Sequence, residues 1–282
     1  MRVTFWGTRG SLASPGNETA RYGGNTSCIE VRAADGALLA LDAGTGIRRL
    51  GGAVPASLRR VDVLLTHLHM DHIQGLGFFG PLYNPNVEVH IWGPASTTMS
   101  LRARLTRYLS PPFFPIHLRE LPCVLTLHEV PCAEETVGPF RIVSTLVCHP
   151  GPTVGYRITA DGRTVTYLPD HEPALGAAEF PASSEWTSGF ALAADADLLI
   201  HDAQYADQEY RSRMGWGHST FAQAVRFATV TRAKQLIVFH HDPERSDDAL
   251  ERVVAAEALP VAGALPVSIA AEGTSIDVGA TA

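Results

Sequence analysis

Basic residues are in the minority in this chain of 282 residues, which has 22 Lys and Arg against 29 Asp and Glu and a formal net charge of −7. A protein that binds long stretches of nucleic-acid backbone usually needs the opposite balance, because it must neutralise phosphate charges. The charge therefore favours small substrates.

Long apolar runs, linker-like tracts and paired cysteines are also missing. No apolar run approaches the ~18 residues of a membrane span, and the first residues lack the charged region and cleavage site of a signal peptide. We therefore expect a cytoplasmic protein without membrane contact. No Ser/Gly tract or charge run divides the sequence, so we expect one domain over residues 1–282. The four cysteines form no CxxC pair, which indicates small buried side chains.

Short runs of β-branched and aliphatic residues recur along the chain, and helical spacing appears mainly in its later part. Strands are expected at residues 2–6, 28–32, 38–42, 61–66, 87–92, 140–147, 164–168, 198–201 and 236–240. Helices are expected at residues 96–109, 221–231 and 247–258. This pattern predicts an α/β fold of two sheets packed face to face with helices outside, a four-layer αβ/βα sandwich.

Three imidazoles and one carboxylate stand within six residues, at His67, His69, Asp71 and His72, directly after the apolar run of residues 61–65. A strand is expected to end there, and side chains that alternate along a strand can converge on one point beyond its end. The spacing predicts that His67 and His69 share one metal ion and that Asp71 and His72 bind a second.

Three other strand-like segments also end in His or Asp. His149 is the best candidate for a third ligand of the first ion, Asp170 could bridge the two ions, and either His240 or His241 ends a further apolar run. Strand ends of this kind predict a ring of ligands at one edge of the sheets. Imidazole and carboxylate without thiolate suit Zn²⁺, and also Mn²⁺ or Fe²⁺.

A Gly-rich turn places His218 just before the predicted helix at residues 221–231. Ser219 or Thr220 can cap this helix, which would hold His218 at its N-terminus, where free amide N–H groups favour an anion. A His there can donate to a phosphoryl oxygen or protonate a leaving alkoxide. The alternative is a cap-region His exposed to water.

Taken together, these motifs resemble those of the metallo-β-lactamase-fold hydrolases. They are most similar to the branch that contains ribonuclease Z and the cyclic-phosphonate phosphodiesterases. The similarity runs through residues 7–11, 24–28, 41–44, the HxHxDH motif at 67–72, residues 149, 155–156, 167–170 and 196–203, the GHST motif at 217–220, and residue 240. HxHxDH is specific to the superfamily, whereas GHST selects the branch.

The resemblance implies that six residues divide between two ions and that a seventh bridges them: His67, His69 and His149; Asp71, His72 and His240; and Asp170. It also implies that Asp202 orients His218 and that Asp71 accepts a proton from the bridging water. His241 remains the second choice at the last strand end.

We therefore expect a dinuclear-metal phosphodiesterase that acts on small, especially cyclic, phosphodiesters such as cyclic nucleotides. A hydroxide bridging the ions would attack phosphorus, and His218 would assist the leaving oxygen. The alternatives are a lactone or thioester hydrolase on the same site and a catalytically silent accessory metalloprotein.

The resemblance also argues against tRNA as a partner, because ribonuclease Z enzymes carry a long arm between the third ligand and the bridging Asp. Here His149 and Asp170 are only 21 positions apart. Relatives in this branch are commonly homodimers, which suggests the same for this chain.

Two further features have open roles. Phe113 and Phe114, in a Pro-rich loop, are hypothesised to form part of a lid that stacks on a nucleobase, although such aromatics often pack under their own loop. Arg9, in a Gly-containing loop, could pair with phosphate or serve the structure.

Overall fold

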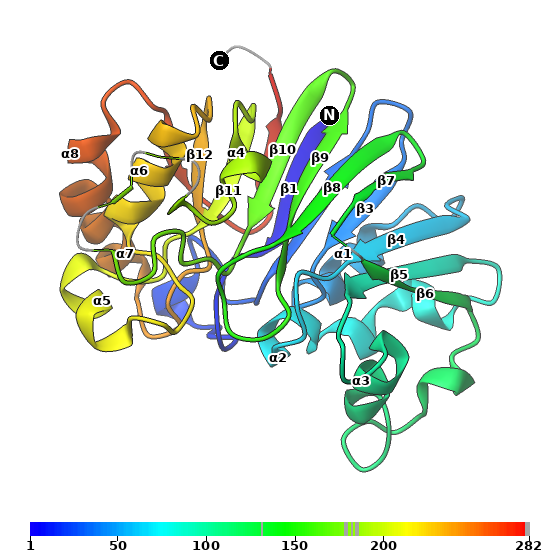
Figure 1. Ribbon diagram of the computed structural model, residues 1–282. Helices are drawn as coiled ribbons and strands as arrows, with labels where there is room; N and C mark the ends of the chain where they lie inside the picture. The colour runs from blue at the N-terminus through cyan, green and yellow to red at the C-terminus, as the bar shows by residue number, and fades with distance from the viewer. Residues whose placement is uncertain (131, 178–179, 182, 184–185, 280–282) are drawn as a thin grey trace.

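Two seven-stranded mixed sheets form the centre of the molecule in a computed structural model, which describes residues 1–130, 132–177, 180–181, 183 and 186–279 (Figure 1). In order across the first sheet, the strands are β14 (Ser275–Asp277), β1 (Arg2–Gly7), β2 (Cys28–Arg32), β3 (Leu38–Leu41), β4 (Arg60–Leu64), β5 (Glu88–Pro94) and β6 (Val124–Val130). In order across the second sheet, they are β13 (Val267–Ile269), β12 (Leu236–Phe239), β11 (Leu198–Asp202), β10 (Arg163–Leu168), β9 (Val154–Ala160), β8 (Phe140–Leu146) and β7 (Glu134–Val137).

Helices cover the outer faces of both sheets. They are α1 (Ile47–Ala53), α2 (Met70–Ile73), α3 (Leu101–Tyr108), α4 (Phe190–Ala193), α5 (Asp207–Arg213), α6 (Phe221–Val230), α7 (Asp247–Val253) and α8 (Leu259–Ala262). Figure 1 shows α1–α3 on the side of the first sheet and α6–α8 on the side of the second. The predicted α/β four-layer sandwich is confirmed.

Three apolar clusters hold these layers together. One lies between the sheets, where Phe5 of the first sheet contacts Phe239 of the second with ring centroids 6.4 Å apart. A second cluster packs Ile47 and Leu105 against the first sheet, and the third packs Phe227 against the second sheet. Burial of these faces is the main source of stability, since each large side chain contributes ~1.5–3 kcal/mol.

The strands that carry the predicted ligands end at one edge of the sandwich. Strands β10, β11 and β12 run parallel, and β8 has the same direction because two antiparallel pairings separate it from β10. In the first sheet, β4 pairs in parallel with β3 and β5. Loops that follow these strands therefore meet, which is where sheets of this kind form sites.

Several elements were missing from the prediction. Strands β6, β7, β9, β13 and β14 were not predicted. Two of them, β13 and β14, have only three residues each. Such short edge strands depend on pairing with a neighbour rather than on their own pattern. Among the described residues, no helix combines the length and the apolar character needed to traverse a lipid bilayer.

Candidate metal centre

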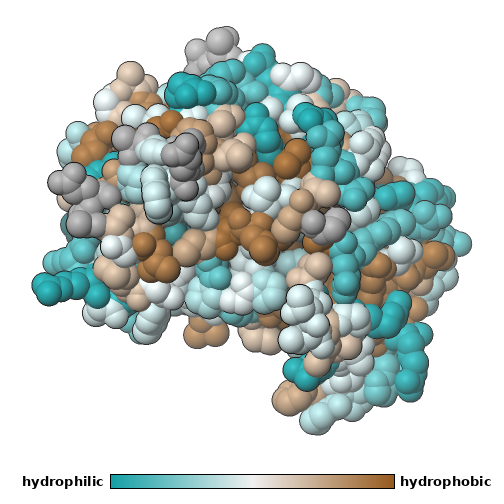
Figure 2. Space-filling view, in the orientation of Figure 1, coloured by the Kyte–Doolittle hydropathy of each residue, from teal (hydrophilic) through white to brown (hydrophobic). Residues whose placement is uncertain are grey.

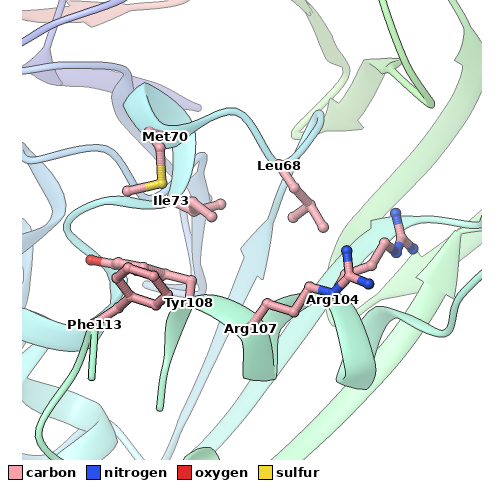
Figure 3. A pocket seen from close by; sticks show the side chains of 7 residues that line it. All are labelled: Leu68, Met70, Ile73, Arg104, Arg107, Tyr108 and Phe113. Atoms are coloured by element: carbon pink, nitrogen blue, oxygen red, sulfur yellow. The ribbon is translucent and has the colours of Figure 1, made fainter. Parts of the chain in front are cut away.

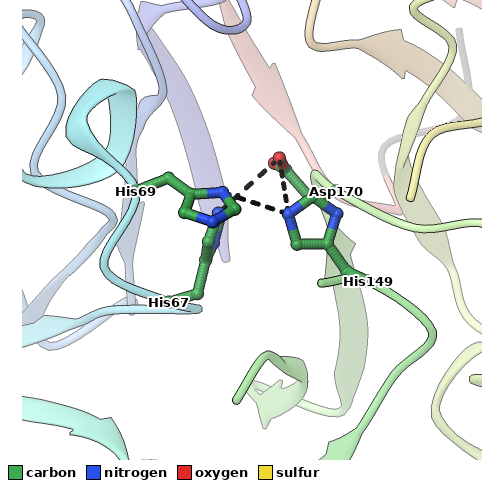
Figure 4. Close-up of side chains that lie close together, drawn as sticks. All are labelled: His67, His69, His149 and Asp170. Carbon is green, nitrogen blue, oxygen red and sulfur yellow. Dashed lines mark hydrogen bonds and ion pairs between the residues drawn. The ribbon is translucent and has the colours of Figure 1, made fainter. Parts of the chain in front are cut away.

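The loop after β4 brings two imidazoles to a third from the other sheet. The Nδ1 atom of His69 lies 3.2 Å from Nε2 of His149, and Nε2 of both His67 and His149 lies 3.7 Å from Oδ2 of Asp170. Figure 4 shows these side chains, which follow strands β4, β8 and β10, pointing toward one another. This first cluster has the donor set of a cation site.

A second cluster lies on the other side of Asp170. Its Oδ1 atom is 2.9 Å from Nε2 of His72 and 3.2 Å from Nε2 of His240. The Oδ2 atom of Asp71 is 3.2 Å and 3.1 Å from the same two nitrogens. All four side chains are buried.

Asp170 therefore belongs to both clusters, with one oxygen turned toward each. Burial alone would raise the pKa of this carboxyl, but the surrounding imidazoles of His240, His72 and His67 outweigh burial and hold it well below its usual range. Burial conversely lowers the pKa of His67 well below its normal value, which favours the neutral ring that a cation needs.

The donors fit divalent cations, because polar atoms are buried here without a protein partner. Among the described residues, Nε2 of His67 has no hydrogen bond, and Oδ1 of Asp170 accepts none with proper alignment despite its close neighbours. Such atoms cost ~1–3 kcal/mol each when unsatisfied. Six imidazole and carboxylate groups around Asp170 would satisfy them by coordinating two ions.

Hydrogen bonds behind the clusters fix which ring nitrogen faces inward. His72 Nδ1 donates to Asp42 at 2.8 Å and His149 Nδ1 donates to the carbonyl of Gly217 at 2.9 Å, so Nε2 of each ring is directed to the centre. Gly217 has φ +87°, and a Cβ there would lie 2.2 Å from the His149 ring. Only glycine fits this position without displacing His149.

Asp42 supports the HxHxDH motif through several hydrogen bonds. Its carboxylate is fully buried and accepts hydrogen bonds from the backbone and hydroxyl of Thr66, from His72 and from the hydroxyl of Tyr167 at 2.9 Å. It therefore connects the core between the sheets to the HxHxDH motif.

We expect Asp42→Asn to weaken Zn²⁺ binding ~10–100-fold, because the amide can no longer accept all of these bonds and His72 loses its orientation. Titration against a chromophoric chelator measures this affinity. Asp62→Asn is the matched control, since Asp62 is buried in β4 but pairs with Arg60 and Trp92. Equal Zn²⁺ affinity in the Asp42 variant and the wild type would contradict the role of Asp42.

A hydrogen-bonded His–Asp pair lies beside the clusters. His218 Nδ1 donates to Oδ2 of Asp202 at 2.6 Å, and the His218 ring stacks on His240 with centroids 5.0 Å apart. Burial opposes protonation of His218, but the charge and hydrogen bond of Asp202 outweigh burial and raise its pKa to about 9. Asp202 therefore favours the doubly protonated ring, in which Nε2 is the second donor.

The helix that follows His218 is capped as expected, by Thr220 rather than Ser219. The Thr220 hydroxyl accepts from the backbone of Gln223 at 3.1 Å, and the Gln223 side chain accepts from the backbone of Thr220 at 3.0 Å. Ser219 instead donates to the carbonyl of His171 at 2.6 Å. This arrangement leaves His218 in the turn before α6, at the edge shared with the clusters.

The contacts of two side chains decide the alternatives that were left open. His241 donates from Nε2 to the carbonyl of Ala270 at 2.9 Å and points away from the clusters, so the structure brings His240 to them instead. The side chain of Arg9 is fully buried and bonds Asp247 and the carbonyls of Gly23 and Arg245. A phosphate role for Arg9 is therefore wrong, because none of the side chain reaches solvent.

Sequence reasoning missed Glu172, which supports the turn before His218. This buried carboxylate accepts from the backbone of Gly215 and Gly217 and from the hydroxyl of Tyr210. Glu172 lies two positions after Asp170 but more than 40 positions before its glycine partners, so no local motif could reveal the contact. Asp42 stands at a strand end within residues 41–44, but its distant partners gave the sequence no sign of its role.

Comparisons with known proteins agree with this geometry. The β-lactamase superfamily domain model matches residues 39–241. The chain is 27% identical to the ribonuclease Z of Gemmatimonas aurantiaca over 88% of each chain. Its structure is similar to the metallo-β-lactamase fold protein YhfI from Bacillus subtilis, with TM-score 0.71, 25% identity and 98% of each chain covered. It is also similar in fold to the short form of human tRNase Z, with TM-score 0.69, 22% identity and 99% and 100% of the two chains covered.

The expectation that tRNA is an unlikely partner is contradicted by these relatives. Proteins named ribonuclease Z match this chain over nearly its whole length, although the spacing between His149 and Asp170 is short. Net charge was a poor guide because it sums the entire surface and does not report local basic groups. Large exposed apolar side chains also occur near the clusters, at Met70 at the start of α2 and at Trp216 in the turn before His218. Figure 2 shows hydrophobic residues gathered near the middle of one face.

The matched model covers most of the chain and includes every residue of both clusters. The chain belongs to the metallo-β-lactamase superfamily of hydrolases.

Proposed function

We propose that this chain is a phosphodiesterase that works with two divalent metal ions. The observation that carries the proposal is the His218–Asp202 pair, whose His218 Nδ1 lies 4.0 Å from Oδ2 of Asp170, the residue common to both clusters. A proton donor beside a site for two cations suits an ester that has charged oxygens and a poor leaving oxygen. Phosphodiesters have both properties.

The seven predicted ligands would hold the ions in two groups that share one carboxylate: His67, His69, His149 and Asp170 in the first, and Asp71, His72, His240 and Asp170 in the second. Zn²⁺ is our first choice for this donor set, with Mn²⁺ and Fe²⁺ as alternatives. When bound, the two ions would neutralise charge on the phosphoryl oxygens and lower the pKa of water between them.

The chain itself supplies the proton transfers. His218 donates from Nε2 to the leaving oxygen, while Asp202 fixes the ring through Nδ1. Asp202 is in turn held by the backbone of Ser219 and Gln204, each at 3.0 Å. Asp71 Oδ2 accepts from the backbone of Ser11 at 2.7 Å, which leaves Oδ1 to accept a proton from the attacking water.

Two classes of nucleotide phosphodiester enter the proposal. RNA enters because relatives named ribonuclease Z match over nearly the whole chain. Small cyclic phosphodiesters, such as cyclic nucleotides, enter because the two clusters and His218 need to contact only one phosphodiester group. The two clusters and His218 would serve the hydrolysis of either class.

The test compares protein loaded with Zn²⁺ or Mn²⁺ with protein stripped by a chelator. Bis(p-nitrophenyl) phosphate, a 2′,3′-cyclic nucleotide and a precursor tRNA are the substrates, and a γ-lactone is the comparison ester. We expect metal-dependent hydrolysis of the phosphodiesters. Hydrolysis of the lactone alone, by protein with two bound ions, would overturn the proposal, as would no hydrolysis of any substrate.

A further inference from the structure

A cavity of about 640 Å³ lies directly beside the metal-binding motif and has no part in the chemistry proposed above. Its first wall consists of the apolar side chains of Leu68, Met70 and Ile73, on the loop and helix that also carry four of the proposed ligands. Its second wall is α3 and the loop after it, with Arg104, Arg107, Tyr108 and Phe113. Figure 3 shows the aromatic rings on one side of this space and both guanidinium groups on the other. The volume is within the range of small-ligand sites.

The loop after α3 exposes one of its two aromatic rings to this cavity. Phe114 is 6% exposed and packs edge to face on Phe78, with ring centroids 5.8 Å apart. Phe113 is 76% exposed, although it is the neighbouring residue. Phe114 therefore serves the core, whereas burial of Phe113 contributes little to folding and its ring is available to a ligand.

The remaining aromatic group is fixed in place. Tyr108 donates its hydroxyl to the carbonyl of Gln74, which follows α2, so its ring is held against the wall of the cavity. Tyr108 and Phe113 thus offer one anchored and one exposed aromatic surface. Aromatic surfaces of this kind stack on nucleobases of any sequence.

Two arginines supply positive charge to the cavity, although Glu129 partly offsets the charge of Arg104. Within the described part of the chain, the exposed side chain of Arg107 makes no hydrogen bond or ion pair, and Nε of Arg104 is buried without a hydrogen-bond partner. Arg104 uses another nitrogen to bond the carbonyl of Pro94, which fixes its side chain at the cavity. A phosphate group would satisfy both guanidinium groups.

We propose that this cavity binds the nucleotide next to the scissile phosphodiester, with its base on Phe113 and Tyr108 and its phosphate at Arg104 and Arg107. This inference rests on the proposed function and extends it, because it requires a substrate with a second phosphate. The preferred substrates are then single-stranded polynucleotide ends, with isolated cyclic nucleotides as poorer substrates.

The experiment measures binding and turnover separately in the metal-loaded protein. The binding probe is a fluorescein-labelled hexauridylate with hydrolysis-resistant phosphorothioate linkages, followed by fluorescence anisotropy over a series of salt concentrations. The turnover substrates are unmodified hexauridylate and methyl p-nitrophenyl phosphate, which has no base and no second phosphate. Phe113→Ala and Arg107→Ala are the test variants, because both side chains are exposed and their loss leaves the core intact. Arg102→Ala, also exposed on α3 but outside the cavity, is the matched control.

We expect Phe113→Ala to weaken probe binding about tenfold with an unchanged salt slope, because a stacking contact is lost. We expect Arg107→Ala to reduce the slope of log Kd against log salt by ~0.7, the value for one phosphate contact on a single strand. In both variants the ratio of kcat/KM for hexauridylate to that for the methyl ester should fall, and the control should retain the wild-type values.

Wild-type binding, salt slope and substrate ratio in both test variants would overturn the inference while leaving the proposed function intact. If metal-loaded wild type hydrolyses neither substrate, the proposed function fails, and the anisotropy data still decide whether the cavity binds a nucleotide.

Discussion

Asp170→Asn is expected to lower phosphodiester hydrolysis by at least ~10³-fold, because the site loses its shared ligand and several kcal/mol of transition-state stabilisation. The substitution keeps the size of the side chain but replaces one oxygen by an NH₂ group. Oδ1 lies 2.9 Å from Nε2 of His72, and Oδ2 lies 3.7 Å from Nε2 of His67. An amide would donate to one of these nitrogens and so occupy the lone pair that a cation needs.

The variant should also bind fewer ions, which is measured by elemental analysis after gel filtration. We expect at most one tightly bound ion per chain, against two in the wild type. Asp195→Asn is the control, since Asp195 is an exposed acid that pairs with Arg232 far from the clusters. Two retained ions together with nearly full activity in the Asp170 variant would contradict the shared-ligand assignment.

The local motif explains why most of the candidate site was accessible from sequence. His67, His69, Asp71 and His72 directly follow an apolar strand, so their convergence needs no knowledge of distant contacts. His149, Asp170 and His240 each follow other strands, and the parallel directions of β8, β10 and β12 bring them to the same edge. Ligands that each follow a strand could therefore be predicted to meet, because the strands run in the same direction.

The supporting contacts were not accessible in this way. Asp42 meets His72 across 30 positions and Tyr167 across 125, and Glu172 meets Gly215 across 43. These contacts depend on how the two sheets and their loops pack, which no periodicity records. Phe113 and Phe114 make the same point locally, because adjacent residues of one type have opposite exposure.

The expectation about partners failed for a different reason. Net charge described the whole chain, whereas Arg102, Arg104 and Arg107 lie on the single helix α3, and two of them line the cavity beside the motif. A surface with an acidic average can therefore hold a local basic site for phosphate. This is consistent with relatives named ribonuclease Z.

The second large effect is expected for His218→Ala, which should lower kcat by ~10²–10⁴-fold with both ions retained, because a positioned general acid contributes this much. His218 contacts Asp202 and Asp170 by its Nδ1 side and stacks on His240, so its removal deletes none of the seven ligands. His90→Ala, which changes a His that stacks on His128 in the first sheet, is the matched control.

The identity of the leaving group separates a proton donor from a structural role. The p-nitrophenolate ion leaves without protonation, whereas the alkoxide of a nucleotide needs a proton, so the loss in the His218 variant should be much larger for a nucleotide substrate than for bis(p-nitrophenyl) phosphate. Asp202→Asn should show the same inequality in weaker form, since the amide keeps the contact with Nδ1 but not the charge. Equal losses for both leaving groups would mean that His218 shapes the site without donating a proton, and the similarity of its turn to the GHST motif would then reflect packing around Asp202.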